Sequence, residues 1–144
     1  MRKYALGFMF SPDRQSVVLI KKNKPDWQRG HLNGVGGKVE EGELFYQTMV
    51  REFLEETGVR RDGGHWRNFC AMTGNDWRVE CFVTFFEDYD LVRSTTDEEV
   101  GVYLVEDVLN CETRNPAIPN LAWLIPLALS REHVHAEINH PTQP

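Results

Sequence analysis

The sequence predicts a single mixed α/β domain, in which helices pack on a β-sheet. Two apolar segments near the N-terminus predict strands, and an amphipathic helix, three further strands and a second helix follow them. The chain has 144 residues, of which 41% are hydrophobic and 11% aromatic. This length corresponds to about one domain of ordinary size. We therefore expect residues 1–144 to form one domain with its own core.

The first two strands are predicted over residues 4–10 and 16–21, which are rich in apolar and aromatic side chains. Residues 11–14 have the composition of a turn, so the two strands are expected to form a hairpin. A polar loop over residues 22–30 follows. The glycine-rich segment 31–37 comes next and interrupts any regular periodicity.

The clearest helix signal covers residues 45–57. Phe45, Met49 and Phe53 recur every four residues and form one apolar stripe. Gly58 stands where a left-handed residue commonly ends a helix. We therefore expect this helix to lie on the sheet with its stripe buried.

The remaining elements are shorter. A second helix is predicted over residues 120–130, with Asn120 as its N-cap. The other segments rich in apolar and β-branched residues predict strands over 66–72, 79–86, 100–105 and 134–138.

Composition excludes several classes of protein. The three cysteines form no C-x-x-C pair, which favours a reducing compartment over a disulfide framework or a zinc site. No apolar run approaches the roughly 18 residues of a membrane span, and no secretory signal is recognisable. We therefore expect a cytoplasmic protein. The net charge of −6 argues against a duplex nucleic acid as partner. A monomer and a homodimer remain equally open.

Three carboxylates occur in the last turns of the predicted first helix. Glu52, Glu55 and Glu56 have the spacing i, i+3 and i+4, so they are expected on one face. They repel one another and oppose the helix dipole, which a bound cation would offset. Carboxylate oxygens suit a hard ion such as Mg²⁺, with Mn²⁺ as the alternative. The competing interpretation is a solvated acidic face.

The segment before the helix adds to this signal. Gly34, Gly36 and Gly37 allow the backbone to approach a ligand closely, and Lys38 follows them. Arg51 directly precedes the carboxylates and can pair with Glu43 or Glu55. A glycine loop that leads into a helix with three aligned carboxylates is a stronger signal than either part alone.

The pattern Gly37-x5-Glu43-x7-Arg51-Glu52-Phe53-x-Glu55-Glu56-x-Gly58-Val59 resembles the Nudix box at every defined position, over residues 37–59. The resemblance implies an α/β/α sandwich around a mixed sheet. It also implies a Mg²⁺-dependent hydrolase of a nucleoside diphosphate linked to another group X. In such a site Glu52 and Glu56 would be the main metal ligands, completed by Glu55 and the Gly37 carbonyl. Glu43 and Arg51 would belong to the catalytic set, and the identity of the general base remains open.

A further metal-binding acid is usual in this family and comes from another loop. Residues 97–99 are all acidic and precede the strand predicted over 100–105. The position of Glu98 relative to Tyr103 resembles that of the metal-binding glutamate in the purine triphosphatases of the family. Glu99 is the close rival, and an acidic loop without function is the third possibility.

Secondary signatures narrow the substrate. The chain lacks the signatures that mark the family's hydrolases of NADH, ADP-ribose, diadenosine polyphosphates and coenzyme A. The resemblance therefore implies a member of the remaining group, the MutT-like nucleoside triphosphatases. Residues 32–43 and the second helix resemble the oxidised-purine nucleoside triphosphatases. The resemblance implies that Asn33, Asn120 and Trp27 contact the base, and we expect Lys38 to hold phosphate. The alternatives are a turn asparagine, a helix cap and a loop anchor, respectively. A non-catalytic Nudix-fold nucleotide-binding regulator and a hydrolase of ADP-ribose or a dinucleoside polyphosphate also remain as alternatives.

Overall fold

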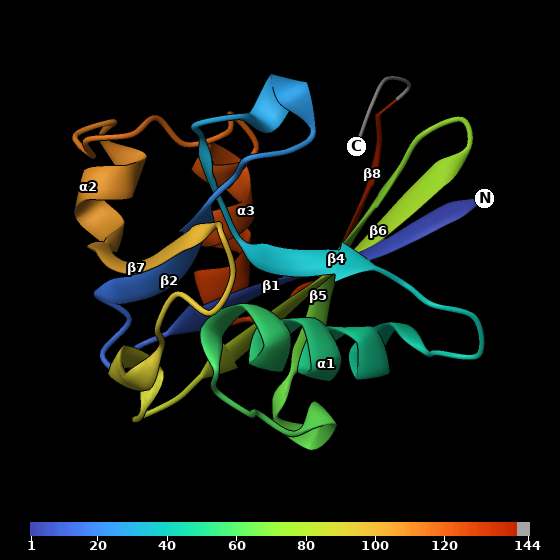
Figure 1. The fold of residues 1–144 in the computed structure, drawn as a ribbon, viewed down its shortest axis with the longest axis horizontal. Helices are drawn as coiled ribbons and strands as arrows, with labels where there is room; N and C mark the ends of the chain where they lie inside the picture. Colours follow the sequence, from blue (N-terminus) through green and yellow to red (C-terminus); the bar gives the residue numbers. More distant parts are fainter. Residues whose placement is uncertain (141–144) are drawn as a thin grey trace.

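The computed structural model describes residues 1–140, so residues 141–144 of the predicted domain lie outside the described part (Figure 1). The strands are β1 (Arg2–Phe10), β2 (Ser16–Lys21), β3 (Leu32–Asn33), β4 (Val35–Lys38), β5 (Arg67–Thr73), β6 (Trp77–Phe85), β7 (Glu99–Leu104) and β8 (Ala136–Asn139). The helices are α1 (Phe45–Thr57), α2 (Val105–Leu109) and α3 (Leu121–Leu129), with short 3₁₀ turns at Asp26–Gln28, Gly63–His65 and Tyr89–Leu91. The predicted mixed α/β class is confirmed.

Strand β1 lies at the centre of an eight-stranded mixed sheet with the main order β3-β2-β1-β6-β5-β8. It pairs in parallel with β6 along its whole length and antiparallel with β4 over residues 4–7. The predicted hairpin with β2 is therefore reduced to the single pair Phe10↔Val17. Since β4 already occupies that edge of β1, strand β2 pairs instead with β7 over residues 16–21.

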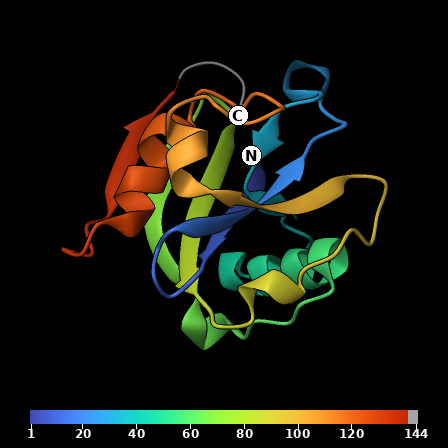
Figure 2. The same cartoon turned by 90° about the vertical axis from the view of Figure 1, so that its left-hand side faces the viewer.

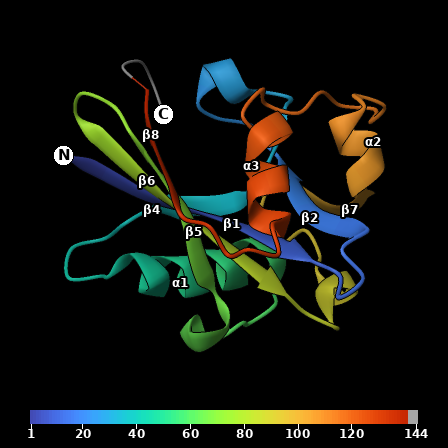
Figure 3. The same cartoon turned by 180° about the vertical axis from the view of Figure 1, so that it is seen from behind.

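Two apolar cores lie on opposite faces of the sheet. Side chains alternate along β1, as the strand period requires. Leu6 and Phe8 belong to the core beneath α2 and α3, while Ala5 and Met9 belong to the core beneath α1. Figures 2 and 3 show α1 on one side of the sheet and α3 on the other. The expected α/β/α arrangement is thus present.

Helix α1 has the bounds that its periodicity predicts. Met49 and Phe53 are fully buried, and Phe53 packs edge-on against Trp66. At the N-terminus of the helix, the side chain of Gln47 accepts a hydrogen bond from the backbone N–H of Leu44. Gly58 ends the helix in the left-handed conformation, with φ of 75°. The apolar stripe therefore holds the acidic end of α1 against the sheet.

One short helix is missing from the predictions, and one local prediction is wrong. Helix α2 was not predicted, because five residues are too few for a periodic signal, although Val105 and Val108 face the core. Asn120 does not cap α3. Its backbone is already helical, with φ −60° and ψ −25°, whereas a capping side chain needs an extended backbone. Among residues 1–140, no helix is both long and apolar enough to cross a membrane.

Candidate active site

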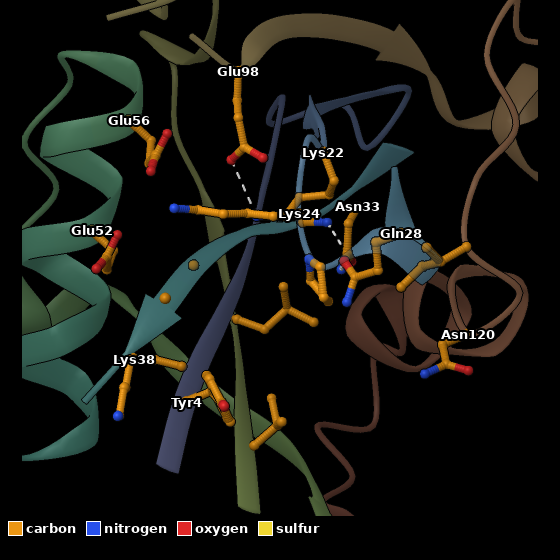
Figure 4. A pocket seen from close by; sticks show the side chains of 18 of the residues that line it. Tyr4, Lys22, Lys24, Gln28, Asn33, Lys38, Glu52, Glu56, Glu98 and Asn120 are labelled. Atoms are coloured by element: carbon orange, nitrogen blue, oxygen red, sulfur yellow. Dashed lines mark hydrogen bonds and ion pairs between the residues drawn. The ribbon is translucent and has the colours of Figure 1, made fainter. Parts of the chain in front are cut away.

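A pocket of about 720 Å³ opens between the C-terminal half of α1, the strands β1 and β4, and the start of α3. Its acidic end is lined by Glu52, Glu56 and Glu98 (Figure 4). Its other end is lined by amides and an indole, from Gln28, Asn33, Asn120 and Trp27. Eight of the sequence-predicted residues line this pocket, although they come from elements that are far apart in the chain: Trp27, Asn33, Gly37, Lys38, Glu52, Glu56, Glu98 and Asn120. Glu43, Arg51 and Glu55 do not line it.

Glu52 reaches the pocket because Gly37 leaves space for it. A Cβ atom on Gly37 would lie 2.7 Å from Glu52 Oε2 and closer still to the carboxylate carbon. The carboxylate is therefore seated directly on the backbone of β4. At this position the absence of a side chain, rather than an unusual backbone angle, is the reason for glycine.

Arg51 organises the turn between β4 and α1. Its guanidinium donates to both oxygens of Glu43, at 2.7 and 3.0 Å, and to the carbonyl of Lys38 at 3.0 Å. It also contacts Glu52 at 2.9 Å and Glu55 at 3.2 Å. These hydrogen bonds lower the pKa of Glu43 to about 2 and raise that of Arg51. The predicted alternatives, pairing with Glu43 or with Glu55, both occur.

The three glutamates of α1 separate into two groups. Glu52 and Glu56 line the pocket, and burial raises the pKa of both carboxyl groups. Glu56 also accepts a hydrogen bond from Thr96 at 3.0 Å. Glu55 is more exposed and pairs with Arg51 outside the pocket lining. Glu55 shares the helix face of Glu52, as its spacing predicts, but its carboxylate turns to Arg51 and does not line the pocket.

Glu98 faces α1 from the segment before β7 (Figure 4). It is only 7% exposed. Its carboxylate accepts hydrogen bonds from Lys22 Nζ at 3.2 Å and from the backbone N–H of Asn23 at 2.6 Å. Of the three acids at 97–99, Glu98 alone lines the pocket, whereas Glu99 is exposed. Of the two rival candidates, the structure therefore brings only Glu98 into the pocket lining.

The acidic end has the chemistry of a hard-cation site. Its donors are carboxylate oxygens, which Mg²⁺ and Mn²⁺ prefer. The ion would offset the repulsion between Glu56 and Glu98 and the cost of burying Glu52. Within residues 1–140, no three acidic, histidine or cysteine side chains are already close enough to surround an ion.

The other end of the pocket is built around two amides. Asn33 is buried; its Oδ1 accepts from the backbone N–H of Gly34 at 2.7 Å, and its Nδ2 donates to Gln28 Oε1 at 3.0 Å. Asn120 also lines the pocket, and its Nδ2 lies 3.9 Å from the sulfur of Met72. Trp27 lies at the rim and is 41% exposed.

Sequence reasoning missed several lining residues. Lys22, Lys24 and Gln28 come from the loop that was interpreted only as polar, and Tyr4 comes from β1. Two lysines and an amide next to a glycine-rich segment could have indicated a loop that faces the site. Lys38, which was expected to hold phosphate, lines the pocket from β4 and is exposed.

Comparison with known proteins identifies the family of the chain. A family model described as NUDIX domain matches residues 1–124. The oxidized purine nucleoside triphosphate hydrolase of Mus musculus is 41% identical over 64 residues, which are 44% of this chain and 39% of that protein. Its counterpart in Danio rerio is 44% identical over 48 residues, 33% of this chain and 31% of that protein. The chain thus matches less than half of the length of either curated relative.

Solved structures share the fold at low sequence identity. A MutT protein from Bacillus halodurans superimposes with a TM-score of 0.71 and 18% identity, covering 98% of this chain and 91% of that one. The NUDIX domain of Shewanella oneidensis NrtR, solved with ADP ribose, superimposes with a TM-score of 0.72 and 20% identity. The match covers 88% of this chain and 84% of that one. The family match and the shared fold together show that the chain belongs to the Nudix domain family.

Proposed function

We propose that this chain is a Mg²⁺-dependent nucleotide pyrophosphohydrolase. One observation carries the proposal: Glu52, Glu56 and Glu98 line one end of a pocket whose other end offers amides and an indole. The acidic end suits the metal-bound phosphates of a nucleotide. The other end offers hydrogen bonds and an aromatic face to its base.

The residues of the site would have separate roles, because some would hold the metal ion and others orient its ligands. Glu52, Glu56 and Glu98 would hold the ion, which neutralises phosphate charge and lowers the pKa of the attacking water. Arg51 orients Glu52 by a hydrogen bond of 2.9 Å and fixes the turn through Glu43. Such positioning of charged groups is the protein's main contribution to phosphoryl chemistry.

Lysines extend the phosphate end of the pocket. Lys24 and Lys38 line it, and neither has an ion pair among those found over residues 1–140. Lysine binds phosphate as a point charge, without the fixed geometry of arginine. We assign both residues to the phosphates that extend from the metal toward the base end.

Two observations support a finer proposal for the substrate class, the pocket size and the relatives. We propose that a nucleoside triphosphate is cleaved to the monophosphate and pyrophosphate, with purines preferred. The volume of about 720 Å³ is in the usual range for a site of this kind. The partial similarity to oxidized purine nucleoside triphosphate hydrolases supports a purine. Asn33, Trp27 and Asn120 would contact it.

A nucleotide panel tests the proposal. The products of dGTP, 8-oxo-dGTP, dATP, dCTP, dTTP, ADP-ribose and a diadenosine polyphosphate are separated and quantified by chromatography, after incubation with Mg²⁺ and with EDTA, and binding of each compound is measured in parallel. We expect Mg²⁺-dependent release of pyrophosphate, greatest for a purine triphosphate. Glu56→Gln should lower turnover by orders of magnitude, whereas Glu106→Gln, an exposed helical control, should not. Binding without hydrolysis of any compound would instead indicate a non-catalytic regulator, and preference for ADP-ribose would overturn the substrate class.

A further inference from the structure

The orientation of two side-chain amides in the pocket is set by one backbone group. The N–H of Gly34 can only donate, so the atom of Asn33 that lies 2.7 Å from it must be the oxygen Oδ1. The Asn33 nitrogen therefore lies on the other branch of the amide. This nitrogen is the donor in the 3.0 Å contact with Gln28.

The orientation of Asn33 in turn determines the orientation of the Gln28 amide. Because Asn33 Nδ2 donates, the contacting atom of Gln28 must be its oxygen, Oε1. The NH₂ group of Gln28 is then the part of that amide left available to a ligand. Both residues line the pocket, and Figure 4 shows them between the carboxylates of α1 and Asn120.

We propose that Gln28 is a specificity-determining residue, which presents hydrogen-bond donors, together with the second N–H of Asn33, to the ligand's base. The proposal rests on the nucleotide function proposed above and adds the donor pattern of its base site. A wall of donors selects a base edge with two neighbouring acceptors. A 6-oxopurine carries acceptors at O6 and N7, whereas adenine places a donor, the N6 amino group, beside N7.

The geometry gives this assignment more weight than either amide would have alone. A free amide can rotate by 180° and offer either a donor or an acceptor, and so it discriminates poorly. Here a rotation of Gln28 would place its NH₂ against the NH₂ of Asn33. A rotation of Asn33 would place its NH₂ against the N–H of Gly34. Each residue therefore holds the next in one orientation.

Binding of product-like monophosphates isolates this effect from hydrolysis. Dissociation constants for dIMP and dAMP are measured by titration calorimetry in EDTA, because these ligands differ only at position 6 of the purine and its neighbouring N1. We expect the wild type to bind dIMP roughly tenfold or more tightly than dAMP. Gln28→Met, which removes both polar atoms, should bring the ratio close to one.

Two charge-changing variants test the direction of the effect. Gln28→Glu can still accept from Asn33 but presents an acceptor to the pocket, so the preference should shift toward dAMP. Asn33→Asp offers an oxygen to Gln28, which should then turn its NH₂ inward and its oxygen to the ligand, with a shift in the same direction. Gln15→Glu, at an exposed site outside the pocket lining, is the matched control and should leave the ratio unchanged.

Equal or tighter binding of dAMP by the wild type would overturn the inference. So would an unchanged ratio in Gln28→Glu, or no binding of either ligand. Failure of the proposed function has a different signature, namely absence of Mg²⁺-dependent hydrolysis while the dIMP preference persists.

Discussion

Replacement of Gly37 by alanine probes the contact between β4 and the carboxylate of Glu52. The added Cβ would lie 2.7 Å from Oε2 and closer still to the carboxylate carbon. Non-bonded carbon atoms pack at about 3.5 Å or more, so the carboxylate must withdraw by about 1 Å. A misplacement of this size near the chemistry lowers turnover by about 100-fold.

The fold should survive this substitution. Gly37 does not have a positive φ, and the group that must yield is the free end of a flexible side chain. We expect a loss of stability of about 1 kcal/mol or less. The assay is kcat for Mg²⁺-dependent pyrophosphate release, measured alongside Tm. Gly64→Ala is the control, because nothing lies within 4 Å of its added Cβ.

Replacement of the neighbouring Gly36 provides a comparison, because its added Cβ would meet backbone rather than a side chain. A Cβ on Gly36 would lie 2.9 Å from the carbonyl carbon of Ala5 and closer still to its oxygen, and this backbone is paired in the sheet. Gly36→Ala should therefore lower Tm, whereas Gly37→Ala should mainly lower kcat. A well-folded Gly37→Ala protein with wild-type kcat would refute the placement of Glu52 at the reacting centre.

Three further outcomes are expected. Glu98→Gln should reduce kcat and weaken Mn²⁺ binding, as followed by electron paramagnetic resonance, more than Glu99→Gln does; the reverse order would make Glu99 the ligand. Burial raises the pKa of the Glu56 carboxyl group, so the metal-free protein loses stability as the pH rises through that pKa. Glu56→Gln removes this cost and should raise Tm in EDTA at pH 8. A lower Tm would contradict this reasoning. The pKa of Glu43 is lowered to about 2, so its pairing stabilises the fold above the ordinary pKa of about 4.3 and is lost as pH falls toward 2. Acid unfolding of Glu43→Gln should lack this part of the pH dependence.

Much of the fold could be predicted because the relevant signals are local. The stripe of Phe45, Met49 and Phe53 and the glycine at position 58 predict α1 with its observed bounds. The pairing partners of the strands could not be predicted in this way. Adjacent strands and a turn indicate a hairpin, but β1 pairs mainly with β4 and β6, and this choice depends on the burial of both of its faces.

The same distinction applies to the candidate site. The spacing of Glu52 and Glu56 places them on one helix face, and the Nudix box resemblance adds Gly37 and Arg51. The spacing does not predict that Glu55 stays outside the pocket lining, because this depends on its pairing with Arg51. The contribution of Gln28 could not be predicted either, because it depends on which amide atom meets Asn33 and on the path of an irregular loop.

The parallel pairing of β1 with β6 also has a consequence for biosynthesis. Residue 2 pairs with residue 77, and the same separation of 75 positions holds along the strand. At translation rates of about 5–20 residues per second, β1 leaves the ribosome roughly 4–15 s before its partner. Residues 5–10 are all buried in the finished sheet. During that interval they have no hydrogen-bonding partner on one edge of the strand. Strand β4 is made much earlier and can cover the other edge, so the β6-facing edge of β1 is the part of the nascent sheet that stays open to pairing with other chains for longest.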